Sequence, residues 1–126
     1  KEYRLIEEGL YHLNSKLSIE IKKEPYSIDN GFSKDPKDVW IDADKVVFPL
    51  SVRVIKEGDR MIPLGMKGSK LISDMLTDTK VSYFDRQRQY VLSNNDQQII
   101  WLLGRRIDDR YKITSSTKTV LKIKLL

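Results

Sequence analysis

Alternation of apolar and polar residues in several short runs is the feature that most restricts the fold of this chain. Leu17–Lys23 reads LSIEIKK, in which Leu and Ile alternate with polar residues, and Leu50–Val54 (LSVRV) and Thr119–Leu126 (TVLKIKLL) repeat the pattern. Successive side chains of a β-strand point to opposite faces, so a period of two predicts strands with one buried face. Tyr3–Leu13 is interpreted as two strand pieces, because Gly9 in its middle favours a turn or bulge over a helix.

A short helix and a hairpin are expected between these strands. Ser69 is the expected N-cap of the helix, and the residues after it place Leu71, Ile72, Met75 and Leu76 on one apolar stripe. The runs on either side of NNDQ predict a β-hairpin, in which Ile99–Leu103 is long and apolar enough for a central strand covered on both faces. We therefore expect an α+β fold, a small mixed sheet or sandwich with one or two short helices.

Length and composition exclude several classes of protein. The 126 residues are enough for one domain with a single core. The chain has no cysteine, which excludes a disulfide framework, a thiolate nucleophile and a cysteine-ligated metal. No apolar run approaches the ~18 residues that span a membrane, so we expect a cytoplasmic protein without a membrane partner. Because the sequence begins at Lys1 with neither Met nor a signal-peptide pattern, we expect it to be part of a longer protein.

The segment Glu24–Asp38 divides the chain into two expected parts. It contains two prolines and an Asn-Gly pair, which are typical of a loop or linker. Residues 1–38 are interpreted as N-terminal strands and a loop, which either pack on the domain or connect it to a preceding one. Residues 39–126 are interpreted as the main domain.

Charge is distributed unevenly along the chain. Residues 1–50 carry 8 Lys/Arg against 10 Asp/Glu, whereas residues 51–126 carry 15 against 8. The basic excess therefore belongs to the second part. Such an asymmetry is compatible with a polyanionic partner, although many basic domains bind nothing charged.

The stretch Gly58–Lys70, GDRMIPLGMKGSK, is the strongest local candidate for a phosphate site. Glycines let backbone N–H groups approach an anion closely. A nucleotide-binding P-loop requires G-x-x-x-x-G-K-[ST], and here Gly65 is followed by Met-Lys-Gly-Ser, one residue out of pattern. ATP binding is therefore not expected. The alternative is a tight strand-to-helix connection stiffened by Pro63.

Catalytic and metal-binding patterns are weak. The single histidine, His12, has no acidic or hydroxyl partner fixed by the sequence, so a surface or packing role is expected for it. The acidic groups in DNGFSKD and IDDR lack the spacing of an EF-hand, and solvated loops are the better interpretation. No catalytic residue and no metal ligand is predicted.

An ordered series of motifs resembles a known family. DADK, PLSVR, GDRMIPLGMKGSKLISD, FDRQRQYVL, IIWLLGRRID and TKTVLKI follow one another between Val39 and Ile123. In this order and spacing the series strongly resembles the C-terminal domain of bacterial tRNA(Ile)-lysidine synthetase. The resemblance implies a fold related to a domain of the phenylalanyl-tRNA synthetase β subunit.

The resemblance also implies a function. The family is an ATP-dependent ligase that joins lysine to the wobble cytidine of the isoleucine tRNA with a CAU anticodon. Its chemistry, with ATP and Mg, belongs to an N-terminal domain that carries an SGGxDS-type loop, and no such motif occurs in this chain. The chain is therefore expected to be a non-catalytic module that binds the tRNA acceptor stem, with the ligase domain as its partner in cis. The alternative is a scaffold that docks the ligase core or a dimer mate without touching RNA.

Basic and aromatic side chains are the expected RNA contacts. Cations that neutralise phosphates release counterions and make binding salt-dependent. Exposed aromatic rings stack unpaired bases. Stacking is predicted for Tyr83 or Tyr111 and weighed for Phe84, for which core packing is favoured, as it is for Trp40 and Trp101. The predicted phosphate ligands are Arg53, Arg60, Lys67, Lys70, Arg86, Arg88, Arg105, Arg106 and Arg110.

Overall fold

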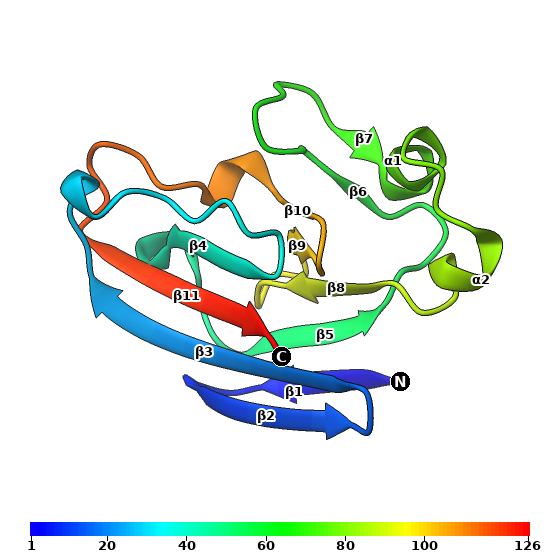
Figure 1. The fold of residues 1–126 in the computed structure, drawn as a ribbon, viewed down its shortest axis with the longest axis horizontal. Coiled ribbons are helices and arrows are strands. Elements are labelled where there is room, and N and C mark those ends of the chain that lie inside the picture. Colours follow the sequence, from blue (N-terminus) through cyan, green and yellow to red (C-terminus); the bar gives the residue numbers. More distant parts are fainter.

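The computed structural model describes residues 1–126, which form two antiparallel sheets, a two-stranded ribbon and two short helices (Figure 1). Three short 3-10 turns lie in the connections: η1 (Ile28–Asn30), η2 (Ala43–Lys45) and η3 (Asp109–Tyr111). The strands and helices are β1 (Glu2–Leu5), β2 (Gly9–Asn14), β3 (Leu17–Pro25), β4 (Asp38–Asp42), β5 (Leu50–Val54), β6 (Arg60–Met61), β7 (Lys70–Leu71), α1 (Ile72–Asp78), α2 (Tyr83–Arg86), β8 (Tyr90–Ser93), β9 (Ile99–Leu102), β10 (Arg106–Ile107) and β11 (Thr119–Leu125).

The two sheets combine strands from both ends of the chain. One sheet has the order β1-β5-β8-β9-β10 and the other the order β2-β3-β11-β4, and β6 pairs with β7. The longest ladder joins β3 to β11, from Ile19 opposite Leu125 to Pro25 opposite Thr119. In Figure 1, α1, α2 and the β6-β7 ribbon lie together at one end of the molecule, away from β2 and β3. The predicted fold class, α+β with one or two short helices, is confirmed.

The N-terminal segment contributes to both sheets. As predicted, Tyr3–Leu13 forms two strands, β1 and β2, and Gly9 begins the second with φ 147°. β1 pairs with β5 in the first sheet, whereas β2 pairs with β3 in the second. Residues 1–38 therefore share their backbone hydrogen bonds with strands from the rest of the chain.

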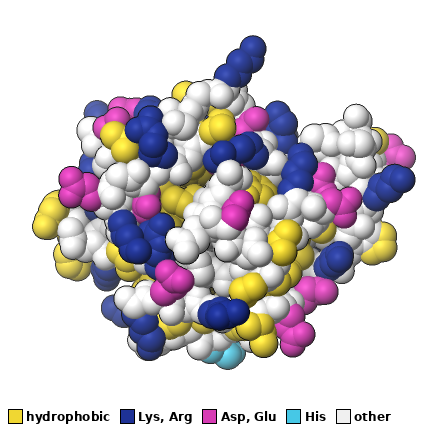
Figure 2. Space-filling view, turned by 180° about the vertical axis from the view of Figure 1, so that it is seen from behind, with side chains coloured by type: hydrophobic (Ala, Val, Ile, Leu, Met, Phe, Trp, Pro, Cys, Tyr) yellow, Lys and Arg dark blue, Asp and Glu magenta, His cyan; other side chains and the backbone are white.

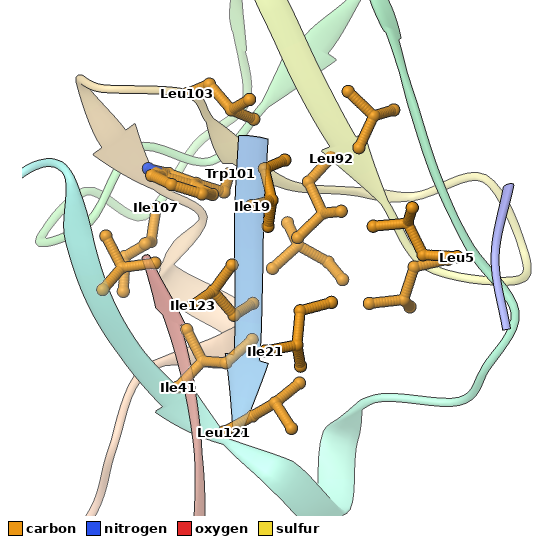
Figure 3. Close-up of a cluster of buried hydrophobic side chains, with 14 of the residues drawn as sticks. Leu5, Ile19, Ile21, Ile41, Leu92, Trp101, Leu103, Ile107, Leu121 and Ile123 are labelled. Carbon is orange, nitrogen blue, oxygen red and sulfur yellow. The ribbon is translucent and has the colours of Figure 1, made fainter. Parts of the chain in front are cut away.

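The main core lies between the two sheets. Sixteen buried residues form it, and Figure 3 shows Ile19, Ile21, Leu121 and Ile123 of the second sheet facing side chains that include Leu92 and Trp101 of the first. The alternating residues of β3 and β11 supply this layer, which is the physical reason for their period of two. Burial of such side chains stabilises by about 25 cal/mol per Å² of apolar surface.

A second core explains why β9 is buried on both faces. Ile99 and Leu102 pack with Met61 of β6 and with Ile72 and Leu76 of α1. Trp101 of the same strand packs in the main core instead. The prediction of a hairpin with a central, doubly covered strand is thus confirmed, since all four residues of β9 are buried.

The expected start of the helix is wrong. Ser69 does not cap α1: Leu71 occupies the N-cap position, and the Ser69 hydroxyl instead accepts a hydrogen bond from the Arg60 guanidinium at 3.0 Å. The two residues after it pair with β6 as β7, and α1 begins only at Ile72. The apolar stripe itself is correct at Ile72, Met75 and Leu76, which are all buried.

Candidate nucleic-acid interface

The glycine-rich turn is fastened by acidic residues of its own chain. The Gly65 N–H, at φ 87°, donates to Asp109 Oδ1 at 2.9 Å, and the Ile62 N–H donates to Asp108 Oδ2 at 2.9 Å. The Leu64 N–H donates to the Ile107 carbonyl. The hydrogen bond from the Gly65 N–H and, after it, that from the Lys112 ammonium lower the pKa of Asp109. The N–H groups of Ile62, Leu64 and Gly65 are therefore not available to an external phosphate, because carboxylates and a carbonyl already accept from them.

Arg110 completes this anchor and is not a free cation. Asp108 is fully buried, and both its oxygens accept from the Arg110 guanidinium, at 2.9 Å and 2.8 Å. The hydrogen bond to Asp108 raises the pKa of Arg110. The predicted phosphate ligand Arg110 is thus neutralised within the domain.

Arg53 is also withdrawn from the surface. It was predicted to be a phosphate ligand, but its side chain is only 14% exposed and makes a bidentate pair with Asp59 at 2.8 Å and 3.0 Å. Burial alone would raise the pKa of Asp59, but the hydrogen bonds from Arg53 and from the Lys56 backbone outweigh burial and lower it. The pair holds the turn after β5, and the prediction that Arg53 is available to a partner is wrong.

The other cations of the turn differ in their availability. Arg60 reaches across to Ser69, with no carboxylate partner, and so keeps its charge at the surface. Lys70 pairs with Asp78 at the end of α1. Lys67 is exposed and makes neither a hydrogen bond nor an ion pair.

The short helix α2 displays two adjacent aromatic rings. Tyr83 is 78% exposed and Phe84 is 66% exposed, so the preference for core packing of Phe84 is wrong. The guanidinium of Arg88 lies 4.2 Å from the centre of the Phe84 ring and also approaches Asp85 at 3.7 Å. Arg86 instead binds α1, through Thr77 Oγ1 at 2.8 Å.

Tyr111 cannot stack a base in this structure. It is only 3% exposed, and its hydroxyl donates to Gln98 Oε1 at 2.7 Å and accepts from Asn94 Nδ2 at 3.2 Å. Burial raises the pKa of Tyr111. The aromatic ring belongs to the main core, because η3 turns it inwards between the sheets.

Arg105 and Arg106 stand out among the predicted ligands. Neither has a carboxylate partner: the Arg105 Nε donates to Gln89 Oε1 at 2.8 Å, and an Arg106 nitrogen donates to the Leu64 carbonyl at 2.6 Å. Arg105 lies in the turn between β9 and β10, Arg106 is the first residue of β10, and both are exposed. Neutral acceptors orient their guanidinium groups without cancelling their charge.

Three cavities meet at this turn. Arg105 lines all three, whose volumes are about 560, 170 and 300 Å³, and Arg106 lines the two smaller ones. Lys70 lies beside both arginines on the cavity of 170 Å³. On one face of the molecule Figure 2 shows hydrophobic atoms in the hollows between Lys and Arg side chains. Of the predicted phosphate ligands, the structure thus brings Lys70, Arg105 and Arg106 together at this turn. Arg53 and Arg110 line none of the three cavities and are paired with carboxylates.

Sequence reasoning missed several residues of this surface. Lys16 and Lys37 line the largest cavity opposite Arg105, and Lys34 lines the cavity of 300 Å³. They lie in the acidic first half of the chain and reach the cavities through the second sheet, in which β2 pairs with β3 and β11 pairs with both β3 and β4. Gln89, which orients Arg105, also gives no signal in the sequence.

Neither a candidate metal cluster nor a membrane-spanning helix is found. No group of three or more His, Cys, Asp or Glu side chains is arranged to hold a metal ion. None of the helices has the length and apolar character that crossing a membrane would need.

Two solved structures are similar in fold to this chain. The structure is similar over 99% of its length to a crystal structure of a TilS C-terminal domain, with a TM-score of 0.79 and 19% identity, and covers 96% of that chain. It also resembles an N-terminal fragment of the phenylalanyl-tRNA synthetase β subunit from Pyrococcus horikoshii, over 70% of this chain and 27% of that one, with a TM-score of 0.59 and 16% identity. The two likenesses confirm the expected relation in fold.

Sequence relatives have one name in common. A tRNA(Ile)-lysidine synthase of Parabacteroides distasonis is 40% identical over 95% of this chain, and that of Bacteroides thetaiotaomicron is 38% identical over 84%. The chain spans about a quarter of the length of these relatives, 27% and 25% respectively. The model of the TilS substrate C-terminal domain matches residues 50–124. Since that match extends over more than half of the 126 residues, the chain belongs to the TilS substrate C-terminal domain family.

Proposed function

We propose that this domain is the non-catalytic tRNA-binding part of a tRNA(Ile)-lysidine synthase and that it contacts the acceptor stem of the isoleucine tRNA. The observation that carries the proposal is the Arg105–Arg106 turn, where two cations without carboxylate partners adjoin three cavities. A protein that uses its cations internally pairs them with carboxylates, as Arg53 and Arg110 do here. Unneutralised charge on oriented guanidinium groups suits phosphate, which accepts two N–H groups in parallel.

The mode of binding follows from the form of RNA. A-form RNA has a major groove too narrow for side chains, so a duplex stem is recognised by shape and by phosphate and 2′-OH contacts. Arg105 and Arg106, with Arg60 and Lys67 on the neighbouring turn, serve as the phosphate ligands, since none of the four has a carboxylate partner. The exposed rings of Tyr83 and Phe84 serve unpaired bases.

The chemistry of the whole protein belongs outside this chain. In this proposal the parent enzyme attaches lysine to the wobble cytidine of tRNA-Ile(CAU), with ATP and Mg held by the N-terminal domain. The present domain holds the distant end of the same tRNA and thereby positions the anticodon relative to the ligase domain. It supplies no proton transfer and no nucleophile.

A scaffold role is the second candidate, and exposed apolar side chains favour it. Ile6, in the turn between β1 and β2, is 63% exposed, and Leu10 of β2 is 53% exposed. Phe32 is 58% exposed in the loop before β4. Such residues suit a contact with the ligase domain or with a dimer mate.

Binding of two RNA fragments separates the candidates. Fluorescence anisotropy of the 126-residue chain is measured with an acceptor-stem minihelix and with an anticodon stem–loop of the isoleucine tRNA, between 50 and 300 mM KCl. We expect tighter binding of the minihelix and an affinity that falls steeply with salt. Absence of salt-sensitive binding to either RNA would contradict the proposed function and leave the scaffold role.

A further inference from the structure

The largest cavity combines a cationic rim with an apolar wall. Its volume is about 560 Å³, and it lies among the β2–β3 turn, the segment before β4, the end of α2 and the β9–β10 turn. Four of its side chains are cationic and one is a carboxylate, Asp85, which lies 3.7 Å from Arg88. The cations that line it are Lys16, Lys37, Arg88 and Arg105.

The wall of this cavity is built for a flat, partly apolar group. Leu17 and Leu103, which are 5% and 6% exposed, line it together with the Tyr90 ring and Leu125. Small-molecule sites typically occupy about 300–1,000 Å³ and combine apolar walls with a few fixed polar groups. The volume suits one nucleotide, whereas a base-paired stem is too wide to enter.

Gln89 orients Arg105, the side chain of this cavity that can bind an anion. This residue is 6% exposed, and its amide nitrogen donates to the carbonyls of Tyr90 and Leu103 at 2.9 Å and 3.0 Å. The amide oxygen is thereby directed at Arg105 Nε, at a distance of 2.8 Å. The two terminal nitrogens of Arg105 make no hydrogen bond within the domain and keep their donors for a ligand.

We infer that this cavity binds a single unpaired RNA nucleotide, with its base against Leu103 and Tyr90 and its phosphate on Arg105, which Gln89 positions. The inference rests on the proposed function and adds a substrate class to it: an unpaired nucleotide that continues a duplex stem, as at the 3′ end of a tRNA. Arg88, stacked on Phe84, closes the rim on the α2 side. The duplex itself stays outside, on the cations of the glycine-rich turn.

Three minihelices with the same stem test the inference in the wild-type chain. One ends bluntly, one has an unpaired 3′ overhang, and one has an overhang of abasic residues with the same number of phosphates. Because stacking on protein side chains contributes substantially for each base, we expect the overhang to be bound about tenfold more tightly than the blunt end. The minihelix with the abasic overhang should bind only slightly more tightly than the blunt one.

A cavity-filling variant locates the effect. Leu125→Trp adds bulk to the wall without changing charge, and Val47→Trp, on an exposed residue that does not line the cavity, is its control. We expect Leu125→Trp to lose the preference for the overhang and Val47→Trp to keep it. Circular dichroism melting checks both folds. Independently of either variant, 4-thiouridine in the overhang should crosslink in the wild type to peptides that contain Lys16, Lys37 or Tyr90.

The outcomes distinguish this inference from the proposed function. Equal affinities for blunt and overhanging RNA, with salt-sensitive binding of both, would overturn the nucleotide subsite and leave stem binding intact. A preference for the overhang that persists in a folded Leu125→Trp variant, or crosslinks only outside the cavity, would also overturn it. Failure to bind any of the three RNAs would overturn both proposals.

Discussion

Truncation of Trp101 to alanine should remove a large part of the stability of the domain. Trp101 is fully buried in the cluster of sixteen residues between the two sheets, opposite Leu92 in the β8–β9 ladder. Trp→Ala substitutions in cores cost about 3–5 kcal/mol, from lost burial and from the cavity that remains. One feature of this site reduces the expected cost.

The indole N–H of Trp101 is buried and has no hydrogen-bond partner. An unsatisfied buried donor costs about 1–3 kcal/mol, and its removal returns that free energy. With this penalty taken at its lower end, about 1 kcal/mol, the expected loss for Trp101→Ala is about 2–4 kcal/mol, which is a large share of the ~5–15 kcal/mol that typically stabilises a domain. Trp101→Phe, which keeps an aromatic ring and deletes the unpaired N–H, should cost much less.

Urea unfolding followed by circular dichroism measures both variants against the wild type. The matched control is Trp40→Ala, because Trp40 is half-buried, lies against Lys122 at 4.1 Å and also has an unpaired indole N–H. We expect a smaller loss for this control, since less apolar surface is removed from the core. A loss below about 1 kcal/mol for Trp101→Ala, with an unchanged urea dependence, would refute the reasoning on burial.

Three further predictions concern the N-terminal segment, the loss of stability at acid pH and the binding of ATP. Deletion of residues 1–38 should unfold the domain, because β1 and β3 pair with β5 and β11; a cooperative melt of 39–126 alone would show instead that this part folds independently. Since the pKa of Asp59 is lowered on folding, its pair with Arg53 stabilises at pH values above the unfolded pKa of about 3.9 and is lost as pH falls through the lower folded value. In Asp59→Asn the free energy of unfolding should therefore fall less steeply below pH 4 than in the wild type. The same steepness in both proteins would contradict this role of Asp59. Calorimetric titration with Mg-ATP should give no saturable heat at micromolar affinity, because the glycine-rich turn lacks the P-loop pattern and carboxylates already accept from the N–H groups of Ile62 and Gly65.

The strands were predictable where one face of a strand enters the core. Ile19 and Ile21 of β3 and Ile123 of β11 are buried, whereas the polar residues that alternate with them along each strand are not. The period of two is therefore visible in the sequence itself. β9 was predictable for the opposite reason, because it is covered on both faces. The start of α1 was not, since Lys70 and Leu71 pair with β6, about ten residues earlier in the chain, and so move the N-cap position from Ser69 to Leu71.

The site was predictable only in part, because whether a cation is available to a ligand depends on its partners in the folded domain. The pairing of Arg110 with Asp108 is local, two residues apart, and IDDR could have suggested it. The orientation of Arg105 by Gln89 spans sixteen residues and depends on the alignment of β8 with β9. No period or motif encodes such a contact.

Aromatic residues show the same limit. Phe84 and Tyr111 each stand in a mixed, charged segment, and residue type alone favoured the core for the first and stacking for the second. The structure reverses both, because α2 lies at the periphery while η3 turns Tyr111 into the space between the sheets.

The salt dependence of tRNA binding tests the central claim most directly. The double variant Lys67→Glu/Arg105→Glu reverses two cations that lack carboxylate partners, and Lys23→Glu/Lys118→Glu changes the net charge equally at exposed residues that line none of the three cavities. Affinity for full-length isoleucine tRNA and for a non-cognate tRNA is measured at several salt concentrations. For Lys67→Glu/Arg105→Glu we expect weaker binding of both tRNAs and a slope of log affinity against log salt shallower by about one unit per lost phosphate contact. The control should keep nearly the wild-type slope, and equal slopes and affinities for all three proteins would contradict tRNA binding by this surface.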